Sequence, residues 1–342
     1  MKTQKAPTIR SVAQRAGVST ATVSYVLNDG PRHVNEETKK RVHAAIKELD
    51  YQPNTAARNL AHRKTNTIGL ILAGLTGSSF ASSDFLDYVR GISAATETSG
   101  YNLLLFGDHQ HARQRQFYRQ LSRSRSVDGI ILLGSSIPDE IIVELNEQGF
   151  PAVLLARGVS GREVFSVQQN YEEGTYMATR YLRENGYKRI AFLGQALRFS
   201  YGAERLEGYA RALRESGVVY ASELVFIPDE PRDDPTVAEI EAALRLDPPV
   251  DAMITDRGLH TLDALRSTGR RVPRDLALLS LDDGGDSQFF SPPLSVLKAP
   301  KFELGKAATE MVIGLIRGES PLQRRLTMPM ELVIRESTPR KG

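Results

Sequence analysis

Short apolar runs recur along the sequence after residue 66, and stretches of helical length separate them. The runs are TIGLILAGL, YNLLLFGD, VDGIILLGS, FPAVLLAR, VFSVQQN, KRIAFLGQ, LVFIPD, DAMITD and LALLSLDD. Each is about as long as a β-strand, and amphipathic stretches such as DFLDYVRGISAATETSG and YEEGTYMATRYLRENG lie between them. Strands that alternate with helices form parallel sheets covered on both faces, so the sequence predicts an α/β body.

These runs are too many for one small sheet, so two doubly wound lobes are expected over residues 67–342. The glycine-containing stretch LLARGVSGREV is predicted to make the first crossing between the lobes. One lobe is therefore expected over about 67–161 and 293–323, and the other over about 162–292 and 324–342. Ligands of open parallel sheets gather at the carboxyl ends of the strands, which in two facing lobes would line a cleft.

The charge of the chain is divided unevenly along its length. Residues 1–66 hold 12 Lys and Arg against 5 Asp and Glu, whereas the remaining 276 residues hold 32 against 36. A basic first segment on a mildly acidic body suggests a polyanionic partner, and a solvated basic face is the alternative. The chain has no cysteine, which excludes disulfides and thiolate metal sites.

The stretch TIRSVAQRAGVSTATVSYVLN has the pattern of two short helices with a tight break between them. Thr8 can cap the first helix, Gly17 can provide the turn, and Ser19 can cap the second. Val34 and Asn35 open a third helix. This is the helix-turn-helix pattern, although the same shape also occurs in domains that touch no nucleic acid.

The second helix of such a motif enters the major groove of DNA, where its first residues meet base edges. Its outward residues here are small or hydroxylated, which permits close approach and hydrogen bonding, and Tyr25 can reach further. The candidate DNA contacts of this three-helix head, residues 1–52, are Thr8, Ser19, Thr20, Ala21, Thr22, Ser24, Tyr25 and Asn28.

Residues 53–66 form a separate segment, in which Pro53 stands at the start of a short helical stretch that ends at Leu60. That stretch is too short to be stable in water by itself. From the residues alone it is either a linker or a helix that needs a partner.

Three stretches, TIRSVAQRAGVSTATVSYVLN, VNEETKKRVHAAIKELDYQPN and AARNLAHRKTNTIGLI, together resemble the lactose-repressor (LacI/GalR) family of bacterial transcriptional regulators. The resemblance implies that Thr20, Ala21 and Tyr25 read bases. Many members carry Arg or His where this chain has Tyr25, and tyrosine lacks the bidentate fork that arginine offers to guanine.

The same resemblance implies that residues 53–66 contain a hinge helix that folds on DNA from both subunits. Leu60 would then be wedged between the central base pairs in the minor groove, which bends the site. Ala57 is small enough for close approach, and Asn54 and Arg58 can contact the groove or its phosphates.

Polar residues follow several of the apolar runs in the body: Arg157, Asn170, Asp256 and Asp282. Charged and amide groups at strand ends suit a polar, hydroxyl-rich ligand. A helix cap or a salt bridge between lobes is an equally good explanation for each residue alone, but together they favour a ligand cleft.

The body stretches SVQQNYEEGTYMATRYLRENGYKRIAFLG, ERLEGYARALRESG and VPRDLALLSLDD resemble the same family and, through it, periplasmic sugar-binding proteins. The resemblance implies an effector cleft lined by Phe85, Arg157, Asn170, Arg205 and Asp282. The chain departs from the family pattern at Gln169, where members usually have aspartate. The usual Asn-Asp pair near AMITDRGLHTLDAL is also not intact, although Asp256 is kept as a candidate.

Two features could indicate other chemistry. His109 and His111 are two residues apart, but no third ligand is evident nearby, so no metal site is expected. The acidic loop LDDGGDSQF lacks the ligand spacing of an EF-hand, and a strand-end loop facing the cleft is preferred. The sequence contains no nucleophile elbow, no phosphate-binding loop and no dinucleotide fingerprint, so neither an enzyme nor a cofactor is expected.

The sequence thus predicts a DNA-binding regulator, most simply a repressor of a metabolic operon, whose operator affinity is controlled by a sugar-like effector bound between two lobes. Palindromic double-stranded operator DNA requires a homodimer, and a tetramer is the alternative. With no leucine-heptad run after ELVIRESTPRKG, the dimer is preferred. Neither a signal peptide nor a membrane span is evident, so the cytoplasm is expected. The competing hypothesis is a solute-binding receptor for a small sugar with no DNA role.

Overall fold

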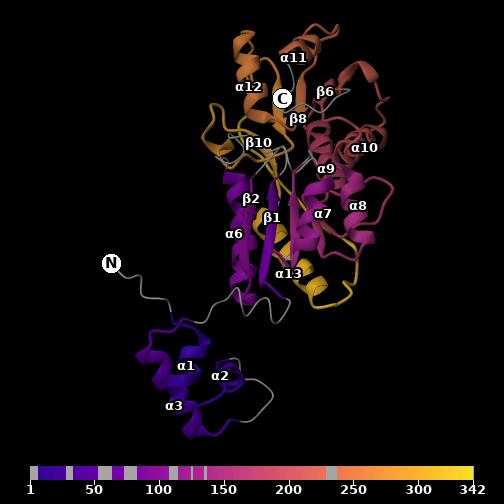
Figure 1. The fold of residues 1–342 in the computed structure, drawn as a ribbon. Helices are drawn as coiled ribbons and strands as arrows, with labels where there is room; N and C mark the ends of the chain where they lie inside the picture. Colours follow the sequence, from indigo (N-terminus) through magenta and orange to yellow (C-terminus); the bar gives the residue numbers. More distant parts are fainter. Residues whose placement is uncertain are drawn as a thin grey trace. The chain divides into compact units, whose positions relative to one another are not determined.

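The computed structural model describes residues 7–27, 34–52, 64–72, 83–107, 115–124, 126–134, 137–228 and 237–341. The chain divides into two compact units, Met1–Thr65 and Asn66–Gly342, which we call the head and the body (Figure 1). Among the described helices, none is long and apolar enough to cross a membrane.

The head contains three helices, α1 (Ile9–Ala16), α2 (Thr20–Leu27) and α3 (Glu36–Glu48). Thr8 caps α1 in a capping box. Its hydroxyl accepts the backbone N–H of Ser11, and the Ser11 hydroxyl accepts the backbone N–H of Thr8. Gly17 ends α1 with a φ of 65°, a left-handed conformation that glycine adopts without strain. The predicted break between the first two helices is confirmed.

Side-chain caps also begin the other two helices of the head. The Ser19 hydroxyl accepts a hydrogen bond from the backbone N–H of Thr22 at 3.0 Å, and Asn35 Oδ1 accepts one from Thr38 at 2.8 Å. These bonds satisfy backbone donors that have no partner within a helix. The predicted starts of the second and third helices are therefore confirmed.

A small apolar core joins the three helices of the head. Val12 of α1, Val23 of α2 and Val42 of α3 are completely buried in it. Since each helix contributes to this core from one narrow side, the opposite side of α2 is left at the surface of the head.

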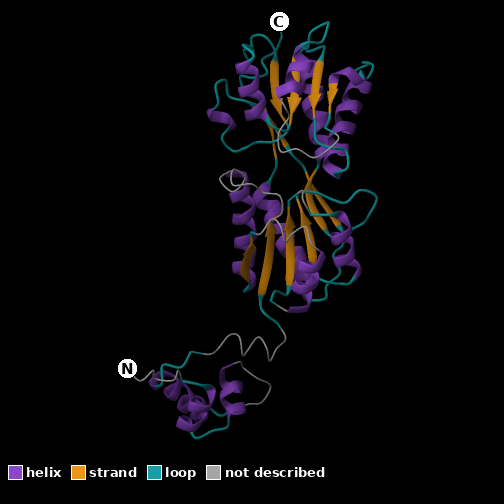
Figure 2. Cartoon of the chain, turned by 45° about the horizontal axis from the view of Figure 1, so that its top comes forward, coloured by secondary structure: helices purple, strands orange, loops and turns teal. Residues whose placement is uncertain are grey.

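The body contains two six-stranded sheets with helices on both faces of each (Figure 2). The first sheet, in the order β11-β5-β4-β3-β1-β2, is the basis of what we call the first lobe, and all of its strand pairs are parallel. Its strands are β1 (Thr67–Leu72), β2 (Asn102–Phe106), β3 (Gly129–Leu133), β4 (Ala152–Leu155), β5 (Ser166–Gln169) and β11 (Arg325–Met328). Its helices are α6 (Ser83–Ser99), α7 (Arg115–Ser124), α8 (Asp139–Glu147) and α13 (Lys301–Ile316).

Alternate residues of these strands point to opposite faces of the sheet, and both faces are buried. Ile131 of β3 belongs to the core cluster that includes residues of α6 and α13, whereas Ile130 belongs to the cluster with residues of α7 and α8. A strand that is covered on both sides must be apolar at consecutive positions, which explains the continuous apolar runs in the sequence.

The second lobe is built on the sheet β12-β10-β9-β8-β6-β7, in which only β12 is antiparallel to its neighbour among the pairs described. Its strands are β6 (Ile190–Leu193), β7 (Val225–Phe226), β8 (Ala252–Thr255), β9 (Ala277–Ser280), β10 (Ser295–Lys298) and β12 (Glu331–Val333). Its helices are α9 (Tyr171–Glu184), α10 (Ser200–Glu215), α11 (Val237–Leu244) and α12 (Gly258–Ser267), with short 3₁₀ turns η2 (Ser222–Leu224) and η3 (Ser287–Phe289).

The chain crosses between the lobes at three places, and none lies where the sequence indicated. The crossings follow β5, which ends at Gln169, β10, which ends at Lys298, and β11, which ends at Met328. The expected lobe boundaries near residues 161, 292 and 323 are therefore wrong by several residues. The stretch LLARGVSGREV joins β4 to β5 within one sheet, because β5 pairs with β4 on one side and with β11 on the other.

Each of the apolar runs identified in the sequence forms a strand, β1 to β9. The last three strands of the chain, β10 to β12, were not predicted. In β11 exposed residues alternate with half-buried ones, and β12 is only three residues long, so neither contains a continuous apolar run.

We expect Gly91→Ala to destabilise the body strongly, because α6 and α13 approach each other closely at this glycine. A Cβ atom there would lie 2.0 Å from the carbonyl oxygen of Phe302, and backbone cannot give way as a side chain can. The expected loss is about 2 kcal/mol or more of unfolding free energy, measured by urea denaturation. Gly314→Ala in α13 is the matched control, since its Cβ would meet only the flexible Glu319 side chain. Equal stability of the two variants would contradict the close packing of α6 and α13.

Candidate nucleic-acid interface and effector site

The first turn of α2 contains the residues predicted to meet base edges. Thr20 and Ala21 are exposed there, and Tyr25 is half-buried one turn later. The Ser19 and Thr22 hydroxyls lie 2.9 Å apart, so they are engaged with each other as well as with the cap of the helix. Thr20 and Ala21 thus form the exposed start of a helix whose other side is packed in the core of the head, as entry into a groove requires.

The remaining predicted DNA contacts divide into two groups. Thr8 is exposed, but its hydroxyl takes part in the cap of α1, and Ser24 is half-buried. The others lie outside the described residues: Asn28, Asn54, Ala57, Arg58 and Leu60.

Arg205, on α10, is buried yet weakly bonded. Its guanidinium carbon lies 4.9 Å from the ring centre of Tyr171 and 5.8 Å from that of Tyr201. Its hydrogen bonds are long, at 3.4 Å to Asp256 Oδ2 and 3.5 Å to the carbonyl oxygen of Leu281. Since a guanidinium has five N–H donors, Arg205 retains the capacity to donate to a bound oxygen.

Asp282 lies two residues after the end of β9 and meets a lysine from the other lobe. Lys301 Nζ donates to Asp282 Oδ1 at 2.8 Å and to the carbonyl oxygen of Asp283 at 3.2 Å. Partial burial raises the pKa of Asp282, but the cations Lys301 and Arg205 outweigh this and hold that pKa below its ordinary value. Asp282 is therefore an ionised acceptor at neutral pH.

These groups form one cluster where the two lobes meet, which we call the Arg205 cluster. It consists of Tyr171, Tyr201, Arg205, Asp256, Asp282 and Lys301. Burial raises the pKa of Tyr201 to about 12, so its hydroxyl stays protonated at neutral pH. The cluster combines carboxyl oxygens, a guanidinium and aromatic rings, which is suited to a ligand with several hydroxyl groups.

Arg157 lies beside the cluster and already makes four hydrogen bonds to the protein. Phe199 stacks on Tyr201 with ring centres 5.3 Å apart, and the Arg157 guanidinium lies 5.8 Å from the Phe199 ring centre. Arg157 also donates to Asp139 Oδ1 and to the Ile137 carbonyl oxygen, each at 2.6 Å. Arg157 therefore bonds to groups of the protein itself in this structure.

Asn170 and Phe85 also have structural roles. Asn170 Oδ1 accepts the backbone N–H of Glu173 at 3.1 Å and so caps α9, one of the alternatives that the sequence left open. Phe85 is buried in the core cluster of α6 and α13 together with Tyr88. Of the predicted effector residues, Arg205, Asp256 and Asp282 come together in one cluster, while Arg157, Asn170 and Phe85 border or support it.

The structure adds Tyr171, Tyr201 and Lys301, which the sequence did not single out. Tyr171 donates a hydrogen bond to the Ala156 carbonyl oxygen, which ties the start of α9 to the end of β4. Its place immediately after Asn170 could have drawn attention to it, but a lysine at the first position of α13 gives no such signal. Gln169, where the family usually has aspartate, is buried, and its Oε1 has no hydrogen-bond partner among the described residues.

The acidic side chain of Asp283 stabilises the turn of the loop that follows β9. Asp283 Oδ1 accepts hydrogen bonds from the Ser287 hydroxyl at 2.5 Å and from the backbone N–H of Gly285 at 3.1 Å. In the described part of the chain, no three His, Asp or Glu side chains are grouped so as to hold a metal ion. His109 and His111 lie outside the described residues.

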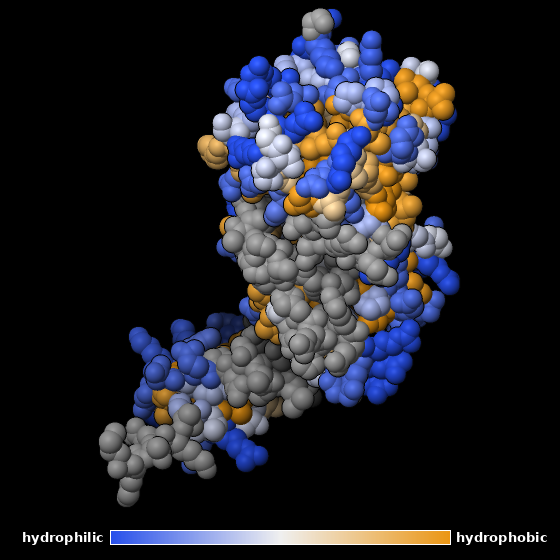
Figure 3. Space-filling view, turned by 90° about the horizontal axis from the view of Figure 1, so that it is seen from above, coloured by the Kyte–Doolittle hydropathy of each residue, from blue (hydrophilic) through white to orange (hydrophobic). Residues whose placement is uncertain are grey.

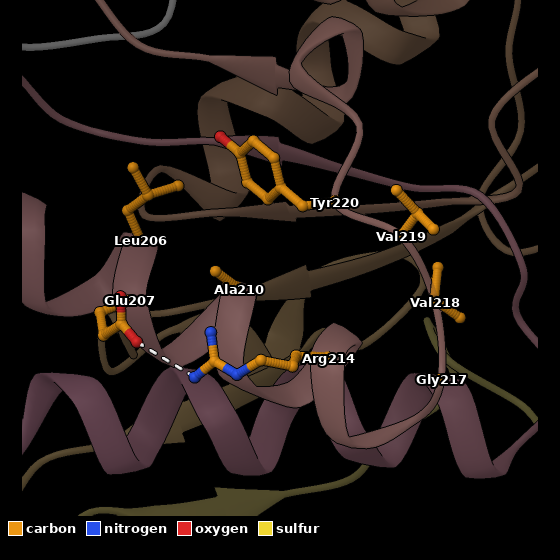
Figure 4. Close-up of a pocket in the computed structure, with 8 residues that line it drawn as sticks. All are labelled: Leu206, Glu207, Ala210, Arg214, Gly217, Val218, Val219 and Tyr220. Atoms are coloured by element: carbon orange, nitrogen blue, oxygen red, sulfur yellow. Dashed lines mark hydrogen bonds and ion pairs between the residues drawn. The ribbon is translucent and has the colours of Figure 1, made fainter.

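A pocket of about 540 Å³ lies elsewhere in the second lobe, between α10 and the residues that follow it (Figure 4). Glu207 and Arg214, on α10, form an ion pair of 3.4 Å there, and Val218, Val219 and Tyr220 line the pocket from the loop. None of its lining residues belongs to the Arg205 cluster, so this pocket does not account for the predicted effector site.

Two family models match the two units of the chain. Residues 8–54 match the model "Bacterial regulatory proteins, lacI family", and residues 179–338 match "Periplasmic binding protein-like domain". The chain is 33% identical to the HTH-type transcriptional regulator CelR of Thermobifida fusca over 98% of this chain and 100% of that protein. It is 31% identical to the HTH-type transcriptional repressor PurR of Vibrio vulnificus (strain CMCP6), over 96% of this chain and 98% of the repressor.

Solved structures of transcriptional regulators are also similar to this chain. A CelR-cellobiose complex is 32% identical, covers 97% of this chain and 99% of its own, and superimposes with a TM-score of 0.70. A lac repressor dimer bound to operator and the anti-inducer ONPF is 25% identical, covers 98% and 99%, and has a TM-score of 0.77. These relatives are transcriptional regulators rather than enzymes. The chain therefore belongs to the lacI family of bacterial regulatory proteins and is a helix-turn-helix transcriptional regulator with a periplasmic-binding-protein-like body.

Proposed function

We propose that this regulator binds a palindromic operator as a homodimer in the cytoplasm, and that a sugar bound at the Arg205 cluster controls its operator affinity. The ligand shifts the equilibrium between two arrangements of the lobes by the difference between its affinities for them. In this proposal the head reads the half-sites, and residues 53–66 connect it to the body as a hinge that folds on DNA.

The observation that carries the sugar assignment is the loose bond between Arg205 and Asp256. Both side chains are buried, yet their closest N–O distance is 3.4 Å, and each retains hydrogen-bonding capacity. Neighbouring hydroxyls of a sugar both donate and accept, so one sugar edge satisfies a carboxylate and a guanidinium together. Buried polar groups of this kind reject ligands that cannot pair with them.

Cellobiose is the first ligand to test, because the CelR relative was solved in complex with it. Thermal unfolding of the full chain should be followed with cellobiose, a panel of other sugars and sugar acids, and a set of nucleobases. A ligand at about a hundred times its dissociation constant stabilises by about 2.7 kcal/mol, which is readily visible. The proposal requires that a sugar stabilise the protein and change its operator affinity in a gel shift, and it fails if only nucleobases do so.

Exposed apolar side chains along one side of the body support the homodimer. Helices α6 and α12 and the edge strand β2 lie along this side in both ribbon views (Figures 1 and 2). Seen from above, the surface of the body is mostly hydrophilic, and its larger hydrophobic patches gather at the centre and on the right, away from this side (Figure 3). Contiguous exposed apolar patches, rather than single exposed residues, often mark protein contacts. The large exposed apolar residues on α6, β2, α12 and η3 are Leu86, Leu104, Leu105, Leu259 and Phe289.

Tyr25→Ala is expected to relax the preference for one base pair in each half-site. The phenol is the longest side chain among the predicted base-reading residues, and alanine removes its contact, at a cost of about 1–3 kcal/mol in discrimination. Selection of operators from randomised duplexes measures this. Tyr25→Phe, which keeps the ring and loses the hydroxyl, separates packing from hydrogen bonding. An unchanged consensus for Tyr25→Ala would show that Tyr25 does not read the operator.

A further inference from the structure

Lys301 stands at one of the three crossings between the lobes. It is the first residue of α13 and follows the end of β10 at Lys298 by three positions. Its side chain is only 6% exposed, and its ammonium group is held by Asp282 Oδ1 at 2.8 Å and by the Asp283 carbonyl oxygen at 3.2 Å. Removal of the carboxylate would leave this buried ammonium group without its counter-charge, which is unfavourable.

The two ends of this ion pair belong to different lobes. Asp282 follows β9 of the second sheet, whereas α13 packs its apolar side in the core of the first lobe, with Leu304, Ala308 and Val312 fully buried. The bond between Lys301 and Asp282 therefore spans the junction between the lobes.

Helix α13 lies in close backbone contact with α6. A Cβ atom on Gly305 of α13 would lie 2.4 Å from the Tyr88 carbonyl oxygen of α6, and one on Gly91 of α6 would lie 2.0 Å from the Phe302 carbonyl oxygen. Backbones in such close contact move together, because packed interiors are not continuously deformable. Helix α6 also carries Leu86, on the surface proposed for the partner subunit.

Asp282 has one oxygen bonded to Lys301 and still exposes 40% of its side chain. A ligand hydroxyl that donates to the exposed part of this carboxylate would pull on a group already tied to α13. Asp282 thus belongs to the Arg205 cluster and is also bonded to the first residue of α13.

We propose that Lys301 is a positioning residue that ties Asp282 to α13 and so sets the arrangement of the two lobes around the Arg205 cluster. The link to an effector rests on the proposed function, but the role in lobe arrangement does not. It can therefore be tested without ligand or operator.

The absence of cysteine from the chain makes site-specific spin labelling direct. Gln120→Cys on α7 and Ala242→Cys on α11 place one label on an exposed site of each lobe. Residues of α7 pack on the sheet face opposite to α6, so this label stays clear of the proposed subunit surface. When labelled chain is exchanged into an excess of unlabelled chain, each labelled dimer contains one labelled chain and therefore one pair of labels. Pulsed electron–electron double resonance then measures the distance between the labels on the two lobes.

Lys301→Met should broaden this distance distribution, or shift its mean by more than the width of the parent distribution. Lys301→Arg keeps the charge and reach and should restore the parent distribution. Lys306→Met on the same helix is the matched control, since Lys306 is half exposed and pairs only with Glu310 at 3.8 Å among the described residues. It should leave the distribution unchanged.

A purely structural role would lower the urea midpoint of Lys301→Met while leaving the distance between the lobes as it was, and this result would overturn the proposal. If Lys301→Met does not fold, Asp282→Asn weakens the same bond from the other side and must broaden the distribution. A parent-like distribution in that variant would also overturn the proposal. A gel shift on the parent chain decides the proposed function separately, so failure of either one can be recognised.

Discussion

Replacing Leu60 by alanine is expected to lower the affinity for the operator by about 2–4 kcal/mol, which is a loss of about 30-fold to 1,000-fold. Leu60 lies outside the described residues, and its role as a wedge stays a prediction, which rests on the resemblance of its sequence context to the lacI family. An apolar wedge opens a base step and bends the duplex, which brings more of the protein surface against the DNA. Alanine is too short to keep the step open, so the wedge is lost together with the interactions that depend on the bend. A gel shift with a selected operator measures the change.

Leu60→Met is the matched control, since methionine keeps the length and apolar character of the wedge. Binding to random duplex rests on phosphate contacts and falls steeply with salt, so it should be the same in all three proteins. An operator affinity for Leu60→Ala equal to that of the parent chain would remove the hinge wedge from the account.

Arg205→Ala is expected to abolish the response of operator binding to the sugar while leaving operator affinity in its absence unchanged. The variant removes the only described cation held between Tyr171 and Tyr201, and with it the fork that pairs with sugar oxygens. Truncating one member of a buried pair also leaves Asp256 without its counter-charge, so sugar affinity should fall by about 2–4 kcal/mol. Isothermal calorimetry measures the affinity, and a gel shift titrated with sugar measures the response.

Two variants control for charge and position. Arg205→Lys keeps the charge without the fork, so sugar affinity should lie between those of the parent and the alanine variant. Arg214→Ala lies on the same helix, and Arg214 is exposed and paired with Glu207, so the response should be unaltered. A full response in Arg205→Ala would place the effector elsewhere in the body.

Local chemistry made much of this fold predictable. The helix boundaries of the head follow from Thr8, Gly17, Ser19 and Asn35, because caps and left-handed turns depend on a few neighbouring atoms. The strands β1 to β9 follow from continuous apolar runs, because a strand covered on both faces has no polar side.

The division of the body into lobes was not predictable in the same way. Strand β5 belongs to the first sheet because it pairs with β4 and with β11, and β11 lies more than 150 residues later in the chain. No local pattern records that pairing. The stretch LLARGVSGREV contains glycines because the chain turns back between β4 and β5, and the same composition would suit a crossing.

The candidate effector site could also be predicted only in part from the sequence. Strand ends indicated Asp256 and Asp282, which the structure brings together with Arg205 and Lys301, since a polar residue after a buried strand faces the edge of the sheet. They could not distinguish these from Arg157 and Asn170, because a residue in a helix cap or an ion pair looks the same in sequence. Lys301 was missed because its partner Asp282 comes from the other lobe.

Binding of the purified chain to a selected operator, measured by gel shift and by sedimentation, with and without the stabilising sugar, decides whether the protein is a dimeric, sugar-controlled regulator. We expect two chains on each palindromic duplex, much weaker binding to a scrambled duplex, and an affinity that the sugar changes. A single chain that binds both duplexes equally at every salt concentration, with no effect of any sugar, would contradict the proposed function.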